Sequence, residues 1–225
     1  MNAKIVKNCL LNAGVDHLYH ANSVVTALSY INAGGLLSRQ AAENLGVQQT
    51  AQYSDDIDRR FGIYNDIFFD SVDIHLRAHR PNDYGAVMFV YSIDVLDLLT
   101  CFDICITKDN PIYWEYGITE REKYFNNAQE ILLGFSKGDF NKHITIKDIS
   151  VPLSFNYLEE IVIDNPGTMN YELLTEAKGA LEAAAKNIGL KIPITVRNCS
   201  ANCGCHKKYT MSNQRYVYDR FKTEL

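Results

Sequence analysis

The chain has 225 residues, of which 47% are hydrophobic and 22% charged, so it is long enough to bury the core of one sizeable domain. Its formal charge of -5 excludes a uniformly basic nucleic-acid-binding surface, so any such contact needs a local patch. No apolar run approaches the roughly 20 residues that span a bilayer. Residues 1–7 are too polar for a secretory signal. We therefore expect a cytoplasmic protein without a membrane partner.

The N-terminal part predicts a helix, a short strand, a second helix and a glycine turn. Residues 1–13 and 24–31 carry apolar side chains at helical spacing, and residues 17–20 between them favour a strand. The pair Gly34-Gly35 then supplies a left-handed C-cap and a backbone that a ligand can approach closely. His20 and Asn22 therefore lie at a strand-to-helix connection beside this turn. The arrangement predicts a small-molecule site, and a purely structural histidine is the alternative.

The next segment, residues 39–60, is polar and glutamine-rich and is expected to form a mobile loop over that site. It ends in a short helix, capped by Ser54, that carries Arg59 and Arg60. Residues 61–80 are dense in apolar side chains and predict a helix, or a helix that runs into a strand.

The second half of the chain mixes strands and helices without strict alternation. Strands are predicted over residues 86–91, 101–107, 144–146, 157–164 and 192–196, and helices over residues 94–99, 120–135 and 172–188. Thr119 and Glu122 have the spacing of a capping box at the start of the second of these helices. The pattern favours an α+β fold. We expect one domain, residues 1–225, in which residues 166–225 form an appendage.

The C-terminal segment is the best candidate for a local basic patch. Its basic residues are Arg197, Lys207, Lys208, Arg215, Arg220 and Lys222, and its aromatic residues are Tyr209, Tyr216, Tyr218 and Phe221. Basic groups interleaved with aromatic rings suit phosphate contact and base stacking. An amphipathic closing segment with a solvated basic face is an equal alternative.

Six cysteines in a cytoplasmic chain argue against a disulfide framework. Cys199, Cys203, Cys205 and His206 could together offer four soft ligands to zinc. Zinc sites favour two residues between paired ligands, and this crowded spacing departs from that rule. We favour free thiols and assign no metal site.

The opening motif resembles a known family. Leu18-Tyr19-His20, a polar residue two positions later, an apolar helix and Gly34-Gly35-Leu36-Leu37-Ser38 are similar to the start of DarT-type ADP-ribosyltransferases. These bacterial toxins attach ADP-ribose from NAD to nucleic-acid bases. The resemblance implies an ADP-ribosyltransferase-like split β-sheet core, with NAD as co-substrate. It also implies that His20 and Asn22 hold the nicotinamide end of NAD.

Other NAD contacts follow from the same resemblance. The family usually has Thr where this chain has Asn22, and an Asn where this chain has Thr26. Thr26 and Gly35 complete the implied cofactor-binding set together with Arg59. The family places an arginine in a helix after the loop, which implies a catalytic role for Arg60.

The resemblance continues into residues 72–91, where His75 and Arg80 are expected to line the nucleic-acid face together with Lys207 and Lys208 of the tail. A structural role for His75, capping or bracing a turn, is equally open.

Two placements compete for the catalytic carboxylate of the family. Glu130 has matching neighbours but lies in a predicted helix. The segment that begins at His143 has the matching sequel, Val151-Pro152 and a further strand. A histidine can deprotonate a nucleophile at neutral pH, but neutral imidazole does not stabilise a cationic ribose as a carboxylate does. We favour Glu130.

These features predict a toxin that ADP-ribosylates a base in DNA or RNA within a toxin–antitoxin or anti-phage system, with a cognate antitoxin protein as partner. The alternative is an inactive nucleic-acid- or NAD-binding protein with the same fold.

Overall fold

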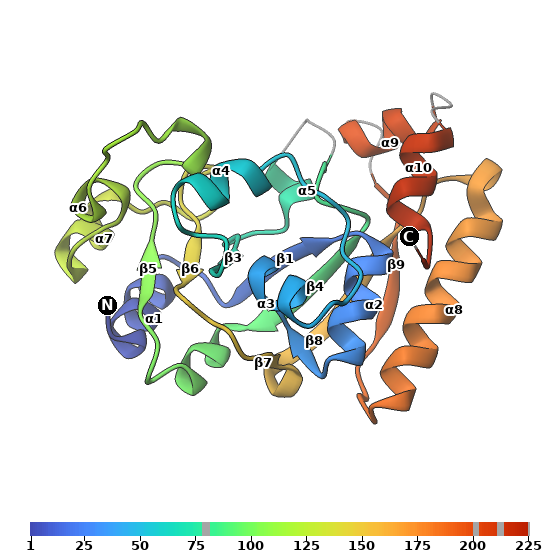
Figure 1. Ribbon diagram of the computed structural model, residues 1–225, viewed down its shortest axis with the longest axis horizontal. Coiled ribbons are helices and arrows are strands. Elements are labelled where there is room, and N and C mark those ends of the chain that lie inside the picture. The colour runs from blue at the N-terminus through green and yellow to red at the C-terminus, as the bar shows by residue number, and fades with distance from the viewer. Residues whose placement is uncertain (78–81, 200–202, 211–213, 225) are drawn as a thin grey trace.

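A computed structural model describes residues 1–77, 82–199, 203–210 and 214–224 (Figure 1). The largest sheet has four strands in the order β1-β4-β8-β9. These are β1 (His17–Asn22), β4 (Val87–Ser92), β8 (Leu158–Asp164) and β9 (Ile194–Arg197). The first three strands are antiparallel, and β9 runs parallel to β8 at the edge. Phe89 and Ile161 are paired across β4 and β8 and are fully buried, so the centre of this sheet lies in the core.

A second sheet has three antiparallel strands in the order β3-β6-β5, namely β3 (Ile67–Phe69), β6 (Ile144–Ile146) and β5 (Ile104–Ile106). Tyr19 of β1 joins the two sheets by exchanging backbone hydrogen bonds with Asp70, at 3.0 and 2.9 Å. A two-stranded ribbon, β2 (Gly35–Leu36) with β7 (Leu153–Ser154), completes the β structure. The predicted α+β class with a split sheet core is therefore confirmed.

Helices pack around these sheets. In the described part of the chain they are α1 (Ala3–Asn12), α2 (Val24–Asn32), α3 (Arg39–Asn44), α4 (Asp55–Arg60), α5 (Ile74–Arg77), α6 (Glu120–Lys123), α7 (Ala128–Gly134), α8 (Tyr171–Asn187), α9 (Gly204–Thr210) and α10 (Gln214–Phe221). Four 3-10 turns accompany them: η1 (Ile93–Leu98), η2 (Pro111–Tyr113), η3 (Phe155–Tyr157) and η4 (Thr168–Asn170). Helix α8 packs on α2, and α10 contacts both helices (Figure 1). No helix among the described residues is long and apolar enough to cross a membrane.

The apolar segment 61–80 has the opposite order to the one predicted. Strand β3 comes first, because Ile67 and Phe69 pair with β6 and bury their side chains, and the short helix α5 follows. Apolar runs of this length do not distinguish a buried strand from a buried helix. Residues 67–69 form a strand because their pairing partner, β6, which lies far away in sequence, supplies the backbone hydrogen bonds.

The single helix predicted over residues 120–135 is two short helices. The capping box of Thr119 and Glu122 is present, as predicted. Helix α6 then stops because Tyr124 leaves the helical conformation and pairs with Thr107 in an isolated bridge. The side chain of Asn127 accepts a hydrogen bond from the backbone of Glu130 and starts α7. Asparagine favours such a cap over a helix interior.

Candidate active site

A cleft opens where the two sheets meet, beside the backbone pairing of Tyr19 with Asp70. It encloses about 880 Å³, including open solvent at its mouth, and its wall combines β1, β3, α4, η2 and the residue before β6. Its polar lining includes His20, Arg39, Asp58, Asp66, Asp70, Asn110 and His143.

His20 presents a neutral imidazole to the cleft. Its Nδ1 is 2.7 Å from the carbonyl oxygen of Phe68, so Nδ1 carries the proton and donates. Burial lowers the pKa of His20, which favours the uncharged ring. The Phe69 ring meets the imidazole edge-on at 5.8 Å and fixes its plane. Nε2 is therefore left as a hydrogen-bond acceptor, suited to a ligand hydroxyl group.

Asn22, Thr26 and Gly35 lie close to this wall in sequence but outside the lining of the cleft. Asn22 is 1% exposed, and its Oδ1 has no hydrogen-bond partner among the described residues. The hydroxyl of Thr26 accepts from the backbone of Thr50 at 2.9 Å and holds the following loop on α2.

Gly35 is needed for close packing between strands. A Cβ atom there would lie 2.5 Å from the carbonyl oxygen of Leu153 in β7. The close backbone approach that was expected at Gly35 is thus made by the chain itself.

Arg39, which sequence reasoning missed, is the arginine that lines the cleft. Its Nε and Nη2 donate to the two carboxylate oxygens of Asp55, at 3.0 and 2.7 Å. Nη1 is buried and has no hydrogen-bond partner in the described part of the chain. Ser38 accepts from the backbone of Ala41 and begins α3, which sets the direction of Arg39. The signal in the sequence was a Ser–Arg pair two residues after the glycine turn.

Two carboxyl groups of the cleft are desolvated. Burial raises the pKa of Asp58 to about 7, and burial raises that of Asp66 to about 7. Oδ1 of Asp66 accepts from the backbone of Asp148 at 2.9 Å, while its Oδ2 lacks a partner among the described residues. Both groups are therefore partly protonated at neutral pH.

His143 and Asp70 form a pair at the end of the β3–β6 ladder. Phe69 lies opposite Ile144, so one further step in the antiparallel register sets Asp70 opposite His143. Nδ1 of His143 is 3.4 Å from Oδ1 of Asp70, and its Nε2 is 3.1 Å from the Asn110 amide nitrogen. Both side chains are more than four-fifths buried, at 12% and 16% exposure. This pair places a carboxylate beside the histidine.

Glu130 has a different environment, on the surface at the start of α7. Its carboxylate accepts from the backbone and side chain of Asn126 and pairs with Lys108 at 3.0 Å. The Asn126 hydrogen bonds, supported by Lys108, lower the pKa of Glu130 to about 2. Glu130 is not part of the cleft lining.

Arg59 and Arg60 lie on the exposed side of α4, outside the cleft lining. Arg59 pairs with Glu43 at 2.8 Å and covers the Tyr64 ring at 3.7 Å.

A basic groove adjoins the cleft. Gln52 and Tyr84 line both hollows, so the two are adjacent. The groove also contains Lys208, Arg215, Arg220 and the almost fully exposed Tyr53. Two aspartates line it as well: Asp219 lies 3.8 Å from Arg215, and Asp83 pairs with Arg220 at 3.2 Å. Lys208 lies over the Tyr216 ring at 4.4 Å, and Arg220 covers the same ring at 3.4 Å. Lys207 is exposed on α9, and Arg80 lies outside the described residues.

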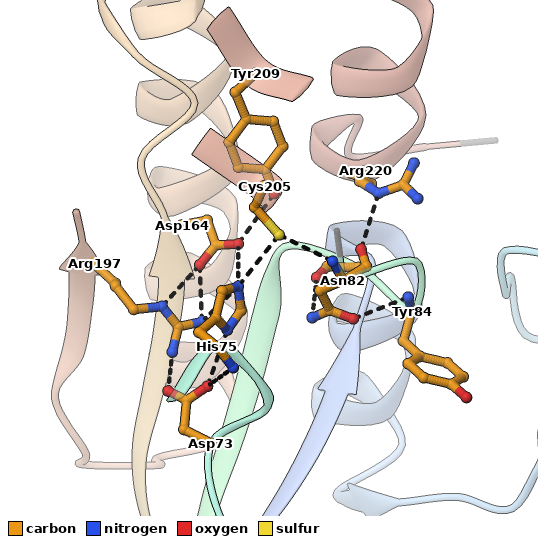
Figure 2. Close-up of polar contacts among 10 residues, drawn as sticks. Asp73, His75, Asn82, Tyr84, Asp164, Arg197, Cys205, Tyr209 and Arg220 are labelled. Carbon is orange, nitrogen blue, oxygen red and sulfur yellow. Dashed lines mark hydrogen bonds and ion pairs between the residues drawn. The ribbon is translucent and has the colours of Figure 1, made fainter. Parts of the chain in front are cut away.

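His75 sits away from both hollows, in a buried polar network (Figure 2). Its side chain is 6% exposed and is held between Asp73 at 2.9 Å and Asp164 at 3.0 Å. Asp164 is paired with Arg197 in the β8–β9 register, and the guanidinium of Arg197 also contacts Asp73. The structure encloses this histidine rather than presenting it on the surface.

No protein-family model matches the chain, and no curated protein matches its sequence. Two solved structures from Thermus sp. 2.9 match its fold. DarT in complex with ADP-ribosylated ssDNA has a TM-score of 0.52 at 10% identity, over 82% of this chain and 95% of that chain. DarT in complex with NAD+ has a TM-score of 0.50 at 10% identity, over 81% of this chain and 96% of that chain. These matches confirm the expected fold.

Proposed function

We propose that this chain, which has the fold of the DarT structures, is an NAD-dependent ADP-ribosyltransferase that modifies a nucleobase in DNA or RNA. The observation that carries the proposal is the convergence of His20, Arg39 and the Asp70–His143 pair on one cleft. The matched structures contain NAD+ and ADP-ribosylated ssDNA, which supports the same substrates here. The reaction breaks the bond from C1′ of the ribose to the nicotinamide nitrogen, and nicotinamide leaves with the bonding electrons. A base nitrogen or oxygen then bonds to C1′ and loses its proton.

The cleft supplies groups that suit each part of NAD. The free Nε2 of His20 accepts from a ribose hydroxyl group. The unpartnered Nη1 of Arg39 donates to the pyrophosphate, for which a guanidinium is well matched. The Asp70 carboxylate stabilises the cationic ribose in the transition state. His143, which already contacts Asp70, takes up the proton of the acceptor base once Asn110 releases its Nε2.

The basic groove suits the nucleic-acid substrate. It shares Gln52 and Tyr84 with the cleft, so a strand bound there would lie beside the bound NAD. Lys208 and Arg215 neutralise phosphates, and the exposed ring of Tyr53 offers a stacking surface for a base. Lys207, next to Lys208 on α9 and exposed, adds positive charge to the same helix.

We further propose that the activity serves as a toxin, in a toxin–antitoxin or anti-phage system in the cytoplasm. Uncontrolled modification of bases is harmful to the cell that makes the enzyme. A cognate antitoxin protein is therefore the expected partner.

A single assay tests the activity. The chain is incubated with labelled NAD and, separately, with single-stranded DNA, RNA and protein. We expect label on a nucleic acid, and loss of that label with His20→Ala. Asp70→Asn and His143→Ala are expected to lower the rate about 100-fold or more, because each removes a group that acts on the reacting atoms. Glu130→Gln tests the residue that the sequence suggested as the catalytic carboxylate. If activity falls in that variant and not in the others, the catalytic carboxylate is Glu130 on α7.

An inactive NAD- or nucleic-acid-binding protein is the second candidate. The observation that favours it is His143, which stands where the family resemblance implies a glutamate. Binding of NAD without transfer to any acceptor would establish this second function and contradict the first.

A further inference from the structure

Cysteine side chains lie near His75 in its buried polar network, outside the cleft lining, and Figure 2 shows one of them, Cys205, beside the imidazole. The ligand atoms of His75, Cys203 and Cys205 lie within 4.8 Å of one another, as do those of His75, Asp164 and Cys199. The two groups share only His75, so its imidazole lies between the sulfur atoms of Cys203 and Cys205 and a second pair of atoms from Cys199 and Asp164. Cys203 and Cys205 are buried, and Cys199 is half-buried.

The separation between the Cys205 sulfur and the His75 nitrogen fits a tetrahedral metal ion. Zinc bonds to sulfur are about 2.3 Å and to histidine nitrogen about 2.0 Å, which sets the two ligand atoms about 3.5 Å apart at a tetrahedral angle. Sγ of Cys205 is 3.6 Å from Nε2 of His75. An ion could therefore bond to both atoms with little movement of either side chain.

Neighbouring groups are arranged as they are around bound zinc. Nδ1 of His75 donates to Asp73 at 2.9 Å, and Nε2 lies 3.0 Å from Oδ2 of Asp164 and 3.6 Å from Sγ of Cys205, so a metal ion at Nε2 would replace the contact with Asp164. A carboxylate that orients a metal-binding histidine through its other nitrogen is a recurrent arrangement. The backbone N–H of Asn82 donates to Sγ of Cys205 at 3.0 Å, which stabilises negative charge on that sulfur (Figure 2).

The charge of the site and the hydrogen bonds that Asp164 already makes indicate which residue is the fourth ligand. Three thiolates and one zinc ion carry a net charge of about -1, and the Arg197 guanidinium, 3.5 Å from Nε2 of His75, offsets it. Asp164 already accepts from Arg197 at 2.8 Å and from the Tyr209 hydroxyl at 3.0 Å. We therefore take Cys199, rather than Asp164, as the remaining ligand.

We propose that Cys199, Cys203, Cys205 and His75 bind a structural zinc ion. Four protein ligands close the coordination sphere, as in structural rather than catalytic zinc sites. On binding, the ion replaces the three thiol protons, which pass to solvent. The site joins the segment before α9 to α5, across a sequence separation of 130 residues between Cys205 and His75. Zinc would thus fasten the segment that carries Cys203 and Cys205 to α5.

Metal analysis of the full-length protein, purified under reducing conditions, tests the site. We expect about one zinc ion per chain. When a mercurial titrates the thiols, the amount of zinc released should rise in proportion to the amount of thiol that has reacted. After exchange for Co²⁺, the sulfur-to-cobalt charge-transfer and intense d–d absorption bands of a tetrahedral thiolate site are expected. These wild-type measurements decide the question even if single variants fail to fold. Folded protein without bound zinc and without cobalt bands overturns the proposal, as does a Cys203–Cys205 disulfide in the purified chain.

Variants then identify the ligands. Cys205→Ser and His75→Ala are expected to lower the zinc content at least tenfold. Cys101→Ser, at an exposed cysteine, is the matched control and should retain it. His206→Ala tests the histidine that the sequence spacing suggests, whose side chain lies outside the described residues. Loss of zinc with His206→Ala but not with His75→Ala contradicts the assignment.

Discussion

Asp55 binds two of the three guanidinium nitrogens of Arg39, at 3.0 and 2.7 Å, and leaves the buried Nη1 without a partner among the described residues. The fork-to-fork geometry fixes the guanidinium plane, so Nη1 is held ready for a ligand oxygen at the cleft wall. In an unliganded protein, a buried donor without a partner costs about 1–3 kcal/mol. That cost is recovered when an anionic ligand binds.

Arg39→Lys is therefore expected to weaken NAD binding. Lysine keeps the charge but cannot hold Asp55 with two bonds and donate to a phosphate in a fixed direction. We expect the KM for NAD to rise about tenfold, equivalent to about 1.4 kcal/mol, with a smaller change in kcat. Steady-state kinetics measure both values. Arg59→Lys tests the sequence-based alternative, and a larger effect there would refute the role of Arg39.

Lys208→Ala and Arg215→Ala are expected to weaken binding of single-stranded DNA or RNA. Each removes a phosphate contact, so the slope of log K against log salt should fall by about 0.7 per residue. Fluorescence anisotropy with labelled oligonucleotides at several salt concentrations gives this slope. Lys191→Ala is the control, because Lys191 is exposed but outside the groove. An equal loss in the control would point to general charge rather than to the groove.

Stability is expected to fall as pH rises from about 4 to about 7. Burial raises the pKa of Asp58 from 3.8 to about 7, and that of Asp66 likewise. In this window the native state keeps protons that the unfolded chain has lost, so the free energy of unfolding decreases with pH. Each group contributes at most about 4 kcal/mol over the full range. Denaturant unfolding at several pH values measures the trend.

Asp58→Asn and Asp66→Asn should each flatten this dependence. Asp56→Asn, at an exposed position of the same helix as Asp58, serves as the control and should leave the slope unchanged. A slope that all three variants retain would show that the two buried carboxyl groups do not cause it.

Gly35→Ala is expected to destabilise the protein by about 1–3 kcal/mol, because overpacking forces neighbouring backbone to move. The added Cβ would meet the Leu153 carbonyl oxygen at 2.5 Å. Gly179→Ala is the matched control, since Gly179 lies inside α8 with open space around its Cβ position. That change should stabilise by about 0.5–1 kcal/mol. Thermal unfolding distinguishes the two, and equal melting temperatures would argue against close packing at Gly35.

Local patterns in the sequence were sufficient for several elements. The apolar run of β4, the helical spacing of α8 and the capping box at Thr119 each predicted the observed structure, because neighbours in sequence determine those features. The same holds for the strand that carries His20 and for the helix after it. The opening motif, with its family resemblance, predicted the fold that the structural matches confirm.

Tertiary structure decided how the functional groups combine. The register of β3 with β6 sets Asp70 opposite His143, and a one-residue shift would have turned these side chains apart. The fold also turns Arg39 to the cleft and leaves Arg59 and Arg60 exposed. Likewise, it brings His75 to Cys205 across a separation of 130 residues. Spacing along the chain could not reveal these pairs, because sheet register and core packing fix them, and both depend on segments far apart in sequence.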